Sequence, residues 1–194
     1  MNSPFSNRNL TGRAVKLSGI AILVCAAPAS ADVKVEVTQS TYELRGLSRE
    51  AIHEDMHRVA RKDGDGIIEG EVNDDLAWKF KFAVADNSCH VTSGEITLKL
   101  SVMLPTWVDE ARADESVRTV WNSYFQELKA HEDGHKTIAV DAAEKINQIA
   151  HGVKAAGPCN ALEESLNDAA RQIVETAEKA QDQHDADAKP FALE

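Results

Sequence analysis

The pentapeptide His131-Glu132-Asp133-Gly134-His135 holds the side chains best suited to chemistry in this chain. Two histidines four residues apart lie on one face of an α-helix, where both imidazoles can bind the same metal ion. The glutamate beside the first histidine can then take a proton from a metal-bound water. The spacing predicts a Zn²⁺ centre in which His131 and His135 are ligands and Glu132 is the general base.

The same pattern, His-Glu-Asp-Met-His, occurs a second time at residues 53–57. In the copy at 131–135, the apolar stripe that includes Leu128 carries His135 into the protein, where a buried imidazole needs a polar partner. In the copy at 53–57, both histidines lie beside the apolar stripe, on the flank of a short helix. We therefore expect metal at 131–135 and a solvated, charged helix face at 53–57. A core histidine pair bonded to carboxylates is the alternative for 131–135.

A third protein ligand must come from elsewhere in the chain, because catalytic zinc sites have three protein ligands and one open position. Glu164 is the preferred candidate, since it lies four residues after Asn160, which is expected to begin the last helix. His184 is the second candidate. It would have to fold back from the C-terminal tail, as would its neighbour Asp185.

Residues 1–31 resemble an export signal. Three basic residues and no acidic one accompany an apolar run at 17–27, and Ala29-Ser30-Ala31 is a small-x-small cleavage site. The apolar run is too short to span a bilayer. We expect cleavage after Ala31, a periplasmic or secreted protein, and no membrane span in the mature chain.

The mature chain of residues 32–194 is long enough for one domain with its own core. It carries 18 Lys and Arg against 32 Asp and Glu, a net charge of −14. Such a charge argues against nucleic acid as a partner. Only Cys89 and Cys159 remain after cleavage, and two cysteines in an exported chain predict a disulfide. A cysteine–metal site is the less favoured alternative.

The hydrophobic periodicity predicts an α+β fold. Residues 33–39 alternate as a strand, and Ser48 can cap a helix that runs to about Lys62. From 67 to 104 the period is near two, with breaks at 86–88 and 93–94 and with Pro105 closing the sheet. The rest is expected to be helical, from about Glu115 to Ala155 and from Asn160 onward, with a frayed tail after Gln181. We predict a small antiparallel sheet in the N-terminal half, packed against long C-terminal helices with a zincin-like HExxH helix.

Several motifs follow one another in a recognisable order. They are Tyr42-x-x-x-Gly46-Leu47-Ser48, Trp78, Cys89, Leu104-Pro105-x-Trp107, Trp121-x-x-Tyr124-x-x-x-Leu128-x-x-His131-Glu132-x-Gly134-His135, and Cys159. The order resembles the DUF922 family, predicted secreted zinc-dependent proteases of bacteria. The resemblance covers nearly the whole mature chain. It implies zinc at His131 and His135 and catalysis by Glu132.

The leading hypothesis is an exported zinc-dependent peptidase, a hydrolase that acts on peptides or proteins through a metal-activated water. The alternative is a non-catalytic periplasmic protein that binds metal or has a structural or interaction role. The sequence carries no signal that identifies the substrate or the oligomeric state.

Overall fold

The computed structural model describes residues 31–64, 66–188 and 193. All of the predicted export signal except Ala31 lies outside these residues. The elements, in chain order, are β1 (Ala31–Leu44), α1 (Arg49–Val59), β2 (Arg61–Asp63), β3 (Gly66–Ile68), β4 (Glu71–Ala85), β5 (Ser88–Trp107), a 3₁₀ turn (Glu110–Arg112), α2 (Glu115–Ala150), β6 (Lys154–Ala156) and α3 (Cys159–Asp187). No helix among the described residues has the length and apolar character that a bilayer span requires.

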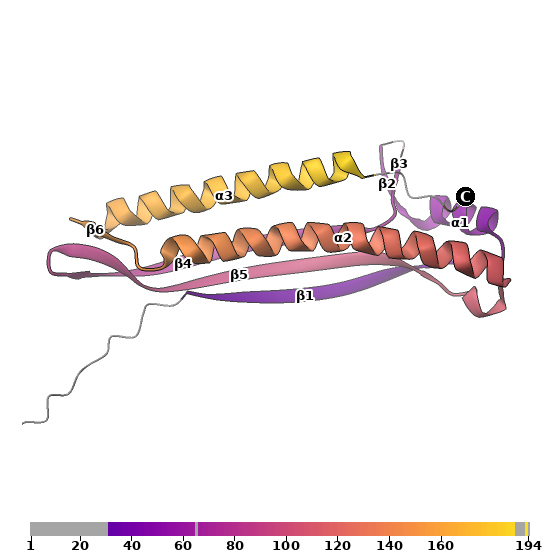
Figure 1. Cartoon of the computed structure of the whole chain (residues 1–194), viewed down its shortest axis with the longest axis horizontal. Coiled ribbons are helices and arrows are strands. Elements are labelled where there is room, and N and C mark those ends of the chain that lie inside the picture. The colour runs from indigo at the N-terminus through magenta and orange to yellow at the C-terminus, as the bar shows by residue number, and fades with distance from the viewer. Residues whose placement is uncertain (1–30, 65, 189–192, 194) are drawn as a thin grey trace, which may run out of the picture.

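The fold is α+β, as predicted: a small sheet carries two long C-terminal helices on one face (Figure 1). The strand order is β1-β5-β4, and β6 pairs with the first residues of β5. Strands β2 and β3 form a separate hairpin near α1. Helices α2 and α3 run antiparallel along the sheet, so the middle of α2 lies beside the C-terminal part of α3 (Figure 1).

The sheet is not wholly antiparallel, and that part of the prediction is wrong. Strands β4 and β5 form the expected antiparallel hairpin, with Asp86 and Asn87 at positive φ in its two-residue turn. Strand β1, however, pairs parallel to β5 along its whole length. Both strands run toward α1, because β4 starts at that end of the sheet and carries the chain back before β5 begins.

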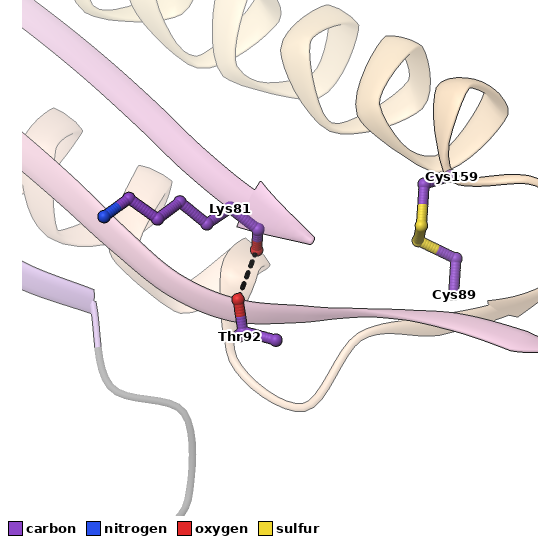
Figure 2. Close-up of a disulfide and its surroundings, with 4 residues drawn as sticks. All are labelled: Lys81, Cys89, Thr92 and Cys159. Atoms are coloured by element: carbon purple, nitrogen blue, oxygen red, sulfur yellow. Dashed lines mark hydrogen bonds between the residues drawn. A yellow bond between two sulfur atoms is a disulfide. The ribbon is translucent and has the colours of Figure 1, made fainter. Parts of the chain in front are cut away.

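Two of the expected sheet breaks, at 93–94 and at Pro105, lie inside β5. Pro105 pairs with Tyr42 of β1. Strand β4 begins opposite Met103, so β5 is paired on one side only at Pro105, where a residue without an N–H is tolerated. The expected break at 93–94 is a register shift, in which Thr92 is the extra residue and its hydroxyl donates to the Lys81 carbonyl at 3.2 Å (Figure 2).

The main core lies between the sheet and the two helices. Its strand side is formed by alternating residues of β5, and its α2 side includes small residues that let the helix approach the sheet. The buried members are Phe80, Cys89, Val91, Ile96, Leu98, Leu100, Ala139, Ala143, Ile146, Ala150, Leu162, Leu166 and Ala170. A second cluster packs α1 against the first turns of α2 and includes Ile52, Met56, Trp107, Trp121 and Tyr124. Together they fix α2 along its whole length.

The predicted disulfide joins Cys89 and Cys159, whose Cα atoms are 5.1 Å apart (Figure 2). It ties β5 to the first residue of α3 across a sequence separation of 70. Cys89 is fully buried. The alternative of a cysteine–metal site is therefore wrong.

Three helix ends differ from the predicted ones. Helix α1 ends at Val59, because the chain turns into the β2–β3 hairpin. Helix α2 ends at Ala150, because residues 154–156 pair with β5 as β6. Helix α3 does not fray after Gln181 but continues to Asp187, and this longer helix brings polar side chains to α2.

Candidate metal centre

The pentapeptide lies in the middle of α2, between the buried residues Leu128 and Ala139. Its two histidines face the C-terminal part of α3, and its glutamate faces the β3–β4 connection. Glu132 and His135 are buried, with 4% and 8% of their surface exposed. The pentapeptide therefore contacts two segments that are distant in sequence, the C-terminal part of α3 and the β3–β4 connection.

Three ligand-type atoms converge between α2 and α3. The Nε2 atoms of His131 and His135 are 3.1 Å apart. The Oδ1 atom of Asp185 lies 3.2 Å from the first and 2.9 Å from the second. Burial and the neighbouring histidines lower the pKa of His131, so its imidazole favours the neutral, metal-binding form. Two imidazole nitrogens and one carboxylate oxygen form a donor set that suits zinc.

A third histidine, His184, packs on the first. The rings of His184 and His131 are stacked, with centroids 4.5 Å apart and planes 9° apart. The Nε2 atom of His184 donates to the carbonyl oxygen of His131 at 2.9 Å. Gly134 makes room for this ring, since a Cβ there would come within 2.6 Å of the His184 Cε1 atom. His131, His135 and His184 also form a group of three histidines whose ligand atoms lie within 4.8 Å of one another.

Gln181 holds the other edge of His135. Its Nε2 donates to the carbonyl oxygen of His135 at 3.2 Å, and its Oε1 lies 2.5 Å from the His135 Nδ1. Because the amide oxygen accepts, Nδ1 carries a proton, and Nε2 is the nitrogen that faces Asp185 and His131. A neighbouring side chain thus fixes the ring in the orientation that a metal ligand needs.

Glu132 is enclosed where α2 meets the β3–β4 connection. A Cβ built on Gly70 would lie 2.6 Å from its Oε1 and 3.1 Å from its Cδ, so the carboxyl rests directly on that backbone. Burial raises the pKa of Glu132 to about 7; His135 opposes this shift, and Asp185 and Glu71 add to it. A carboxyl with a pKa near neutrality is suited to accept and return a proton.

Gly70→Ala should lower the free energy of unfolding by about 1–3 kcal/mol, because the added methyl overlaps a buried side chain that has little room to move. Urea denaturation of the metal-free protein measures the change. In a Glu132→Ala background the overlap is removed, so the same change at Gly70 should cost almost nothing. An equal cost in both backgrounds would show that Glu132 does not rest on Gly70.

The structure does not bring Glu164 to the histidines. This residue is exposed near the start of α3, and its position is 20 residues before His184, about 30 Å along the helix. The second candidate, His184, does reach them, together with Asp185. His53 and His57 are exposed on α1, with ring centroids 4.5 Å apart.

Sequence reasoning missed Gln181, although a signal for it was present. The apolar face of the last helix passes through Ile173 and Ala177, and the same spacing continues to Gln181 and His184. The residues after Gln181 are polar and acidic, so a frayed tail is expected there from the sequence. Polar residues at the positions that continue an apolar stripe indicate that this end of the helix packs on a polar partner.

Comparisons with known proteins place the chain in a family. A family profile described as "Bacterial protein of unknown function (DUF922)" matches residues 39–191. No curated protein and no solved structure matches the chain. Since the profile covers most of the sequence, the chain belongs to the DUF922 family of bacterial proteins.

Proposed function

We propose that this protein is an exported zinc-dependent peptidase, with His131 and His135 as metal ligands and Glu132 as the general base. The observation that carries the proposal is the convergence of two imidazole nitrogens and a carboxylate oxygen within 3.2 Å, next to a buried glutamate whose pKa is about 7. The helix with the pentapeptide would then be zincin-like in its role.

Each of these side chains would have a separate role in peptide hydrolysis. Bound zinc would polarise a carbonyl and acidify a water molecule. His131 and His135 would hold the metal, and Gln181 fixes the edge of the His135 ring through Nδ1. Glu132 would take the proton and return it to the leaving amine. The buried surroundings strengthen these charge interactions.

A groove offers room for the side chains of a substrate. It has a volume of about 500 Å³ and lies between α2 and α3. It begins at Ile138 and Ala180, within one helical turn of His135 and Gln181. Its lining is mainly aliphatic, with Ala142, Ile149, Ile173 and Ala177 among its residues. Such a surface favours an apolar segment of an unfolded polypeptide.

The cellular compartment is part of the same proposal. The N-terminal segment has the pattern of an export signal, and the Cys89–Cys159 disulfide favours an oxidising compartment such as the periplasm or the exterior. Imidazole and carboxylate ligands do not depend on reduced thiols, so a zinc site of this kind is compatible with an oxidising compartment.

The second candidate is a non-catalytic protein that binds metal or has a structural role. The observation in its favour is the cover that α3 places over the histidines, whose side chains are only 14% and 11% exposed. A site that only binds a metal does not need to admit a peptide. Cleavage of an unfolded protein by the zinc-loaded chain separates the two candidates.

The purified mature protein should hold about one zinc per chain, and His131→Ala with His135→Ala should remove it. The physical reason is that two imidazoles on one helical face converge on a common point. Elemental analysis after dialysis measures the metal. The matched control is His53→Ala with His57→Ala, which changes the same motif on the exposed face of α1 and should keep the zinc. Metal lost from the control and kept by the first variant would show that the wrong copy was chosen.

A further inference from the structure

We propose that Asp185, and not His184, is the third metal ligand, so that the site has two histidines and one carboxylate. This inference rests on the metal site of the proposed function and deepens it. It assigns to Asp185 the carboxylate oxygen, and to His184 the task of holding the ring of His131.

The distances favour Asp185. Ligand atoms on a tetrahedral zinc with bonds of 2.0–2.1 Å are about 3.3 Å apart. The three edges of the triangle formed by His131 Nε2, His135 Nε2 and Asp185 Oδ1 measure 3.1, 2.9 and 3.2 Å. A metal would therefore require each edge to widen by only a few tenths of an ångström. The group of three histidines has ligand atoms that are confined only to within 4.8 Å of one another.

The ring orientations exclude His184 in its present position. The lone pair of an imidazole nitrogen lies in the plane of its ring. The rings of His131 and His135 are perpendicular, so their planes intersect and both lone pairs can reach one point. The rings of His131 and His184 are nearly parallel, 9° apart and stacked at 4.5 Å, so their planes share no nearby point. A metal in the plane of His131 is out of the plane of His184.

His184 has a different set of contacts, which suit a supporting role. Its Nε2 is engaged with the carbonyl of His131, and its ring occupies the space that Gly134 leaves on α2. These contacts fix the face of the His131 ring. Gln181 does the same for the edge of His135, one helical turn before Asp185. One side of α3 thus supplies the ligand Asp185 and two residues, Gln181 and His184, that hold the histidine rings of α2.

Asp185 is also placed where a metal can arrive. Its side chain is 62% exposed, while those of the two histidines are 14% and 11% exposed. The solvent side of the site is therefore the carboxylate side, and an open coordination position would face it. A carboxylate also lowers the net charge of a zinc site to +1, against +2 with three neutral imidazoles.

X-ray absorption spectroscopy of the zinc-loaded protein tests the ligand set directly, because scattering from imidazole rings counts the bound histidines. We expect two imidazoles and oxygen ligands. Three imidazoles on the metal would overturn the proposal. Wild-type protein that takes up no zinc would overturn the metal site itself, and with it the proposed function, which is a different result.

Zinc affinity, measured by competition with a chelator, gives a second readout. Asp185→Asn should lower the affinity by more than about 100-fold, because changes outside the ligand shell typically cost 10–100-fold. His184→Gln keeps a donor for the His131 carbonyl and should cost about tenfold. Asp182→Asn, an exposed acid on the same helix, is the matched control and should bind as wild type does. A loss in His184→Gln that equals or exceeds that in Asp185→Asn would overturn the division of roles, and so would unchanged affinity in Asp185→Asn.

Discussion

Glu132→Gln is expected to reduce peptidase kcat/KM by at least ~100-fold while zinc stays bound, since general acid–base catalysis contributes at least that much. Glutamine keeps the size and the hydrogen-bonding capacity of the side chain but cannot accept a proton. Glu132 is not proposed as a ligand, so the metal content should not change. Hydrolysis of an unfolded protein, with elemental analysis of the same sample, measures both quantities.

Two controls distinguish a loss of the catalytic base from a loss of folding. Burial raises the pKa of Glu132 to about 7 from 4.5, so between these pH values the carboxyl is ionised in the unfolded chain but protonated in the folded, metal-free protein, and stability falls as the pH rises. Metal-free Glu132→Gln lacks this cost and should be at least as stable as wild type at pH 8. Glu127→Gln, a change at an exposed position of α2, should keep full activity. Normal cleavage by Glu132→Gln would remove Glu132 from the mechanism, and loss of zinc would make Glu132 a ligand.

Removal of the disulfide should cost about 4 kcal/mol of unfolding free energy, because the bond closes a long loop in the unfolded chain. The variant Cys89→Ala with Cys159→Ala tests this by urea denaturation, with alanine chosen because Cys89 is fully buried and a serine hydroxyl would need a partner there. The two single variants also lose the bond, so each should be nearly as unstable as the double variant. Single losses that add up to the double loss would mean that no bond joins these residues.

The local features of this fold could be predicted because they depend on neighbouring residues. Ser48 caps α1, with its hydroxyl accepting from the Ala51 N–H, as its residue type indicates. The apolar stripe around Leu128 placed the pentapeptide on the inner side of a long helix. The disulfide followed from the number of cysteines, and needed no knowledge of the fold.

Features that depend on distant residues could not be predicted in the same way. Alternation in residues 33–39 indicates a strand but carries no information about its partner, so the parallel pairing of β1 with β5 was missed. The structure does not bring Glu164 to the histidines, and the physical reason is related. Which part of α3 meets His135 depends on the antiparallel alignment of two helices, and this alignment is set by the turn at β6 and by the disulfide.

The uneven packing of α3 would couple metal binding at the proposed site to the docking of half a helix. All three of its buried side chains, Leu162, Leu166 and Ala170, lie in its first half, which the disulfide also anchors. The second half carries Gln181, His184 and Asp185 but no buried apolar residue to hold it on α2. The next buried side chain that the structure describes is Leu193, in the second cluster, so this segment is held less firmly than the first half of the helix. The apparent affinity for the proposed metal would then be the intrinsic affinity multiplied by the fraction of molecules in which this segment is docked.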